Sequence, residues 1–158
     1  MKHYAYHSPI GELTISGTNE ALCGLWLPDK APTQHRDSDQ PSGALAETVH
    51  WLDCYFAKKS LPPLPHMIPA GTEFRRVIWE LLLEIPYGET TTYAAIARKI
   101  AASRGIATMS AQAVGGAVGA NPISILIPCH RVVGSDSSLT GYAGGLLAKQ
   151  FLLDLEVK

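Results

Sequence analysis

The chain has 158 residues, of which 46% are hydrophobic, and its formal net charge at pH 7 is −1. This length and composition are typical of a globular protein with one ordinary core or two small ones, and they exclude a chain that is disordered throughout. The first residues contain no apolar signal region and no stretch approaches the length of a membrane span. We therefore expect a cytoplasmic protein without a membrane partner.

Charge is distributed unevenly along the sequence. Residues 90–135 contain no Asp or Glu but include four basic residues, namely Arg98, Lys99, Arg104 and Arg131. A locally basic face on a nearly neutral protein allows modest, salt-sensitive binding to a polyanion such as nucleic acid. The alternative is a solvated patch that has no partner.

Residues 1–70 are predicted to form a small N-terminal α/β domain. Short alternating or apolar runs at 2–8, 12–16 and 21–27 are separated by turn signals, which predicts an antiparallel sheet. After a loop without periodicity, apolar residues recur at helical spacing from residue 44 to 59. The following proline-rich stretch, LPPLPHMIPAG, is typical of an extended connector.

The remaining residues, 71–158, are predicted to be mainly helical. Apolar residues repeat at helical spacing from Phe74 to Ile85, after Thr72 as a candidate N-cap. Two shorter helices follow, capped by Thr91 or Thr92 and by Ser110. Two short helices joined by a break resemble a helix-turn-helix.

Further along, ISILI at residues 123–127 predicts a buried strand, with a turn after it and a loop at 138–145. A last helix is predicted from Leu146 to Glu156. Its buried face is expected to carry Leu147, Phe151 and Leu155.

The chain contains three cysteines, Cys23, Cys54 and Cys129. Their odd number and wide spacing fit neither a disulfide framework nor a metal clip, so at least one thiol is free. Cys23 and Cys54 lie in apolar segments and are interpreted as core residues. The histidines are scattered without ligand spacing, so we expect no metal.

Cys129 lies between two apolar runs in ILIPCHRVVG and is followed by His130. A cysteine nucleophile acts as its thiolate, and a neighbouring imidazole can take the proton directly or through a water. A carboxylate usually orients such an imidazole, and Glu156, Asp154 and Asp136 are all candidates. A core cysteine without chemistry is the alternative.

The motif IPCHRVVG, with QAVGGAVGANP before it and GYAGG after it, resembles the signature of the O6-alkylguanine-DNA alkyltransferases, or methylated-DNA:protein-cysteine methyltransferases. The resemblance is dense from Gly71 to Glu156, and earlier it is limited to SPIGELTIS and GLWLP. It implies an α+β fold. A ribonuclease H-like domain, made of a small antiparallel sheet with a helix, would precede a mainly helical, winged helix-turn-helix-like domain that binds DNA.

The resemblance also implies the activity. The alkyl group of O6-alkylguanine, and of O4-alkylthymine as a further candidate, would pass irreversibly to Cys129. The product thioether has no carbonyl for water to attack, so each molecule would react once. The partner would be double-stranded DNA containing alkylated guanine, bound through its minor groove by a monomer, and no cofactor is implied.

Individual roles follow from the same resemblance. Cys129 would accept the alkyl group, His130 would activate it through a bridging water, and Glu156 would orient the imidazole. Asn121 would fix the turn that carries the cysteine, and Arg131 would be largely structural.

On the substrate side, the hydroxyl of Tyr93 would contact the extruded guanine, and the backbone around Val132 and Ala143 would read the edge of that base. Gln112 stands where family members often have an arginine that fills the gap left by the base. The helix that enters the groove would approach the DNA closely through its small residues, Ala113, Gly115 and Gly116.

Two other functions are compatible with parts of the sequence. A DNA-binding protein could recognise alkylated guanine without repairing it, although relatives of that kind have tryptophan in place of Cys129. A thiol hydrolase acting on small esters or amides would turn over many times and would not bind DNA.

Overall fold

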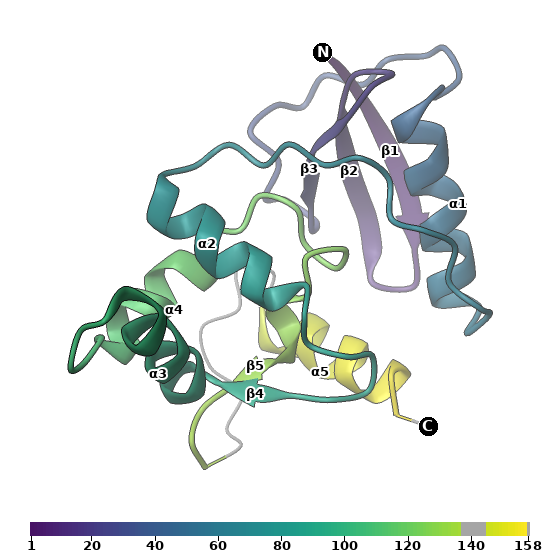
Figure 1. Ribbon diagram of the computed structural model, residues 1–158. Helices are drawn as coiled ribbons and strands as arrows, with labels where there is room; N and C mark the ends of the chain where they lie inside the picture. The colour runs from purple at the N-terminus through teal and green to yellow at the C-terminus, as the bar shows by residue number, and fades with distance from the viewer. Residues whose placement is uncertain (137–144, 158) are drawn as a thin grey trace. The chain divides into compact units, whose positions relative to one another are not determined.

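The computed structural model describes residues 1–136 and 145–157, and the chain divides into two compact units (Figure 1). Unit 1 consists of Met1–Ala70 and Pro122–Ser124, and unit 2 of Gly71–Asn121 and Ile125–Lys158. Within the described residues, no helix is long and apolar enough to cross a membrane.

Unit 1 is built on an antiparallel sheet in the order β1-β2-β3, with β1 at Lys2–Ser8, β2 at Gly11–Gly17 and β3 at Leu22–Trp26. Ile15 in the central strand pairs with a residue of each neighbouring strand, Tyr4 and Leu25. The three predicted strands are therefore confirmed.

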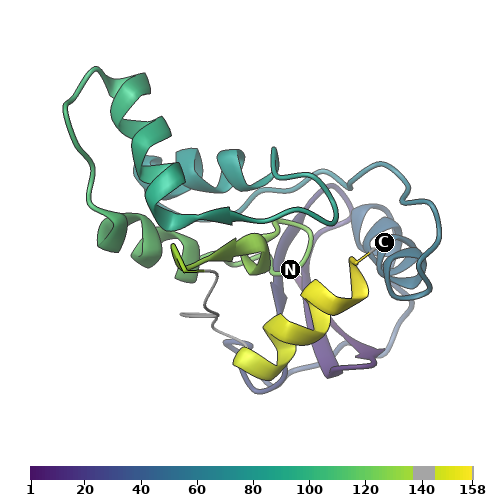
Figure 2. The same ribbon diagram turned by 90° about the horizontal axis from the view of Figure 1, so that it is seen from below.

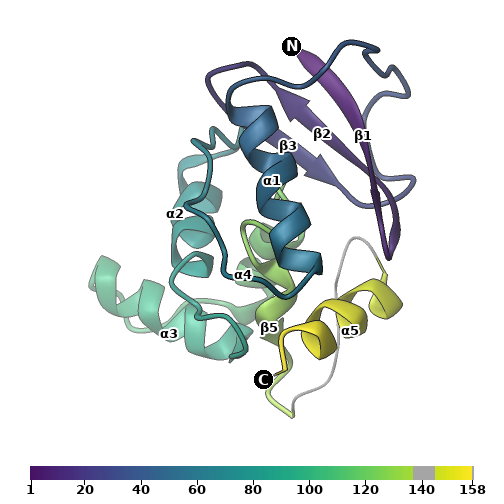
Figure 3. The same cartoon turned by 90° about the vertical axis from the view of Figure 1, so that its right-hand side faces the viewer.

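Helix α1 (Ala44–Phe56) lies against β2 and β3 of the same unit, as Figure 3 shows. Its buried face excludes water from one side of the sheet, which is the main source of stability for such a layer. The predicted helix ends earlier than expected because Lys58 adopts a φ of 57°. The main buried apolar residues of the unit are Leu13, Ile15, Leu22, Leu25, Leu45, Leu52 and Tyr55.

Unit 2 contains the helices α2 (Glu73–Leu82), α3 (Tyr93–Arg104), α4 (Ala111–Gly119) and α5 (Leu146–Leu155). The first three begin after the predicted caps. The hydroxyls of Thr72, Thr92 and Ser110 each accept backbone N–H groups of the first helical turn.

Helix α3 ends at Gly105, whose φ of 66° is the left-handed conformation that stops many helices. Helices α3 and α4 then pack against each other as the two helices of the predicted helix-turn-helix (Figure 1). The α+β class, with a small antiparallel sheet and a mainly helical second part, is confirmed.

A short parallel ladder was not predicted. Strand β4 (Thr91–Thr92) pairs with β5 (Val132–Val133), and the two strands run side by side in Figure 2. Two-residue strands are too short to show alternation in a sequence. The ladder joins the start of α3 to the segment after Cys129.

The strand predicted at residues 123–127 is wrong. Ile123 forms an isolated bridge with Leu25 instead of part of a strand, and Ile125 has a φ of 71°, so the segment turns. A β-branched residue rarely adopts this conformation, and apolar composition alone could not reveal it.

The face predicted to be buried on the last helix is also wrong. Leu147 is 90% exposed and Phe151 is 36% exposed. Lys149, Leu152 and Glu156 are buried instead, at a helical spacing of three and then four. We expected the apolar residues to face inward, but two charged side chains do so. Most of the loop predicted at 138–145 lies outside the described residues.

Candidate active site

Cys129 begins a short 3-10 helix, η1 (Cys129–Arg131), and its side chain is buried with 6% exposure. The turn follows Pro128, and the Cys129 N–H donates to the carbonyl of Ile127 at 2.8 Å. The apolar residues on either side, such as Ile127 and Val132, are fully buried. These flanks fix the backbone that carries the thiol.

Asn121 reaches the same turn. Its Nδ2 donates to the carbonyl oxygen of Ile127 at 2.9 Å, so this oxygen accepts from both Asn121 and the Cys129 backbone. A buried amide that bridges to the main chain restrains the turn.

His130 contacts one of the three carboxylates that the sequence left open. The distance between His130 Nε2 and Glu156 Oε2 is 2.6 Å, and both side chains are buried. Asp154 instead accepts a hydrogen bond from the exposed Gln150, and Asp136 is exposed. The helix end at Glu156 therefore supplies the partner of the imidazole.

Arg131 shares this carboxylate. Its Nε donates to Glu156 Oε1 at 2.7 Å and its Nη2 to Oε2 at 3.1 Å. Its Nη1 donates to the carbonyl of Ile85 at 2.7 Å. The guanidinium therefore joins η1 to α5 and to the loop after α2.

Burial is the largest influence on the imidazole and lowers the pKa of His130, although the hydrogen bond and charge of Glu156 oppose it. A lowered pKa favours the neutral form of the ring. Its other nitrogen, Nδ1, is buried and has no hydrogen-bond partner among the described residues.

Lys149 is a buried lysine that we did not predict. Its Nζ donates to the carbonyl of Val132 at 2.6 Å and lies 6.0 Å from the centre of the Tyr93 ring. The sequence held one signal for it, because Lys149 precedes Glu156 by seven residues and so lies on the same helix face.

A cavity of about 580 Å³ brings together four of the predicted substrate residues. Its lining consists of Tyr93, Ala94, Ala111, Gln112, Gly115, Gly116, Gly134 and Ser135. A Cβ on Gly115 would lie 3.8 Å from the Tyr93 ring, so α4 runs close to that ring.

The remaining predicted substrate residues do not line this cavity. Ala113 is exposed on α4, and Val132 is buried with its carbonyl bonded to Lys149. Ala143 lies outside the described residues.

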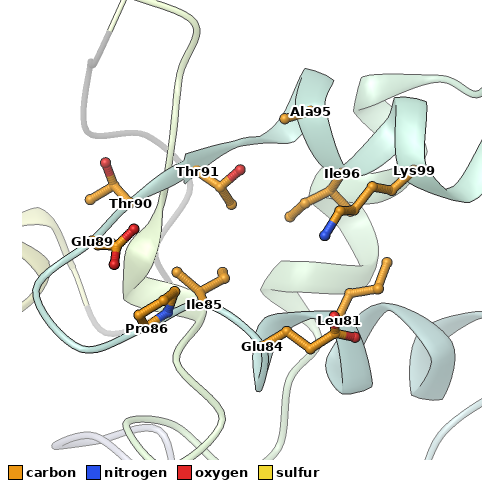
Figure 4. Close-up of a pocket in the computed structure, with 10 residues that line it drawn as sticks. All are labelled: Leu81, Glu84, Ile85, Pro86, Glu89, Thr90, Thr91, Ala95, Ile96 and Lys99. Atoms are coloured by element: carbon orange, nitrogen blue, oxygen red, sulfur yellow. The ribbon is translucent and has the colours of Figure 1, made fainter.

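A second cavity, of about 230 Å³, is lined by residues of α2, of the loop after it and of α3 (Figure 4). Ile85 points its side chain into it while the Ile85 carbonyl bonds Arg131. None of the predicted site residues lines this cavity. Among residues 1–136 and 145–157, no group of three or more metal-binding side chains could hold a metal ion.

The fold and the site define a class: proteins in which a helix-turn-helix unit carries a buried cysteine beside a histidine paired with a glutamate. Comparison with known families gives the same answer. The family described as 6-O-methylguanine DNA methyltransferase matches twice, with its ribonuclease-like domain over residues 1–63 and its DNA binding domain over residues 73–158. The chain belongs to this family, as its PCHR motif predicted.

Relatives and solved structures agree. A methylated-DNA–protein-cysteine methyltransferase of Mycobacterium leprae is 43% identical over 94% of this chain and 88% of its own length. The Methanosarcina acetivorans protein of that name is 39% identical over 99% of this chain and 98% of its own. The crystal structure of Mycobacterium tuberculosis OGT in complex with DNA is 38% identical, with a TM-score of 0.86 over 99% of this chain and 92% of that one.

Proposed function

We propose that this chain repairs DNA by transferring an alkyl group from O6 of guanine to the sulfur of Cys129. One observation carries the assignment of the nucleophile: Cys129 is followed by His130, whose Nε2 lies 2.6 Å from Glu156 in a buried site. In the reaction a sulfur–carbon bond forms and the carbon–O6 bond breaks. The thiol loses its proton and the departing guanine takes one up.

His130 is the group that moves the thiol proton. Glu156 occupies Nε2, which leaves Nδ1 to receive a proton through a bridging water. Asn121 acts as a positioning residue because it holds the carbonyl of Ile127 next to Cys129. Arg131 is structural in that it anchors Glu156.

The cavity between α3 and α4 receives the alkylated base. Its volume of about 580 Å³ lies in the range of small-molecule sites. Tyr93 contributes its hydroxyl to the guanine, and the backbone at Val132 and Ala143 contacts the base edge. The family's chemistry requires a base outside the duplex, and extrusion costs about a few kcal/mol.

Residues 71–158 form the domain that binds DNA and transfers the alkyl group. A monomer of the protein binds double-stranded DNA through the minor groove, with α4 as the entering helix. Ala113 is exposed on α4, and a Cβ on Gly116 would meet nothing within 4 Å, so the helix surface is open there. Gln112, at the cavity wall, fills the space of the extruded base.

The thioether product is stable to water, so each molecule acts once, and no cofactor takes part. We propose, as the sequence led us to expect, that the protein acts in the cytoplasm.

Intact-mass spectrometry after incubation with a methylated duplex oligonucleotide tests the proposal. The protein should gain the mass of one methylene group, and the Cys129→Ser variant should gain none. Cys54→Ser, which removes a half-buried thiol of α1, is the matched control and should react like the wild type.

Two outcomes would contradict transfer. Tight binding to the lesion without a mass change would indicate recognition alone. Repeated turnover of a small ester, without DNA binding, would indicate a hydrolase.

A further inference from the structure

The buried cluster around Cys129 contains more cations than anions when the thiol and the imidazole are both neutral. In their ordinary ionised forms Arg131 and Lys149 are two cations, whereas Glu156 is the only buried carboxylate among the described residues. Burying unbalanced charge is costly in a protein interior. A second negative charge would restore the balance, and the thiol of Cys129 is the group in the cluster that can supply it.

Lys149 is placed to interact with that negative charge. Helix α5 packs against η1, and the ammonium is held 2.6 Å from the carbonyl of Val132, three residues after Cys129. Burial lowers the pKa of Lys149, and the charge of the Cys129 thiolate opposes this change. Attraction between two ionisable groups is mutual, so the ammonium must favour the thiolate equally.

We propose that Lys149 is the counter-ion that holds Cys129 as a thiolate, while Arg131 keeps His130 neutral by sharing Glu156. The proposal rests on the proposed function only in taking Cys129 as the nucleophile. In this state His130 relays the thiol proton to solvent and does not keep it. The guanine that leaves then takes a proton from water, either directly or through the Tyr93 hydroxyl, which regains its proton from solvent.

The groups that face His130 support a neutral ring. Glu156 favours the protonated imidazole, and Arg131 and Lys149 oppose it, in addition to the effect of burial. Within residues 1–136 and 145–157, the other elements add no further buried charged side chain. The buried side chains of α2 are Ile78, Trp79 and Leu82, and the Tyr87 hydroxyl donates to the carbonyl of Leu155.

Thiol titration without DNA tests the role of Lys149. The rate of iodoacetamide reaction at Cys129, followed by peptide mass between about pH 5 and 9, reports the thiolate fraction. Lys149→Met should raise the midpoint by at least about one pH unit, which leaves about tenfold less thiolate below it. Lys99→Met, which removes an exposed cation of α3, should leave the midpoint unchanged.

Two further variants separate charge from hydrogen bonding and from misfolding. Lys149→Gln keeps a donor for Val132 without the charge and should resemble Lys149→Met. Lys149→Arg keeps the charge and should restore most of the wild-type midpoint. An unchanged midpoint in folded Lys149→Gln, or no rescue by arginine, would overturn the role. Because the titration uses no DNA, its result does not depend on alkyl transfer. The role of Lys149 and the proposed function can therefore fail independently.

Arg131 is a positioning residue, and its test is the protonation of His130. In protein labelled with ¹⁵N-histidine, NMR should show a neutral His130 ring at neutral pH. Arg131→Met, which leaves Glu156 to the imidazole, should make the ring protonate at higher pH. The proposal fails if the wild-type ring is already an imidazolium at neutral pH or if Arg131→Met does not change its titration.

Discussion

Two cysteines in the described part of the chain have a histidine as a neighbour, and one of these two pairs resembles a reactive centre. On α1, Cys54 Sγ lies 3.9 Å from Nε2 of His50, at the exposed side of the helix. In η1, His130 follows Cys129 and is bonded to a buried glutamate. The comparison teaches that proximity of thiol and imidazole does not define the site. A buried carboxylate bonded to the imidazole, with buried basic side chains beside it, distinguishes the second pair.

Replacement of the carboxylate beside each pair should give the largest difference. Glu156→Gln leaves Arg131 buried without its counter-charge, which typically costs about 3–5 kcal/mol. Asp53→Asn, beside Cys54, disturbs only an exposed bond from the Tyr6 hydroxyl and should cost less than about 1 kcal/mol. Urea unfolding of both variants measures the difference. Equal losses of unfolding free energy would show that the buried network around Glu156 stabilises the protein no more than the exposed bond at Asp53.

A smaller effect is expected from the amide that supports the reactive turn. Asn121→Ala removes the bond to Ile127 and should cost about 1–2 kcal/mol. Alkyl transfer should slow by about tenfold because small displacements of a reacting atom are costly. Asn19→Ala, which removes an exposed bond from the Ser42 hydroxyl, should not change the transfer rate. Single-turnover kinetics measures both transfer rates. Equal rates for the two variants would show that Asn121 does not position Cys129.

The smallest effect should appear only in acid. Because burial lowers the pKa of His130, the unfolded chain binds more protons below its ordinary pKa of 6.5. The contribution of His130 to stability is therefore complete above that pH and falls as the pH decreases toward the lowered pKa. His130→Gln should show a smaller loss of unfolding free energy between neutral pH and about pH 5.5 than the wild type.

His50→Gln is the control for this acid effect, because that ring is exposed. The pKa of His3, in unit 1, is also lowered by burial. Because His3 is present in the wild type and in both variants, its effect cancels when the pH dependence of each variant is compared with that of the wild type. A His130→Gln protein with the wild-type pH dependence would show that the ring does not contribute.

Local sequence signals predicted much of the fold. Alternation in the first strands, and hydroxyl caps such as Thr72 and Ser110, act over a few residues, so they can be recognised without tertiary information. The signals failed at Ile125, because its positive φ depends on contacts made by distant residues. They failed again on α5, where the inward side chains of Lys149 and Glu156 break the apolar pattern and bond a main-chain carbonyl and Arg131.

Part of the geometry around Cys129 also followed from the sequence, while the catalytic roles of these residues stay predictions. The PCHR motif placed Cys129 and His130 together because the residues are adjacent, and the family resemblance singled out Glu156 from three carboxylates. Nothing in a local pattern could show that Lys149 meets the carbonyl of Val132, because that contact depends on how α5 packs against η1.

The ladder between β4 and β5 restricts how far the start of α3 can move relative to the turn that carries Cys129. Thr92 directly precedes Tyr93, and it is tied by main-chain pairing to the strand that follows the 3-10 turn. The backbones that carry Tyr93 and Cys129 are therefore held together by main-chain hydrogen bonds. Homologues that accept bulkier adducts should differ in the side chains around the cavity and keep the same main-chain frame.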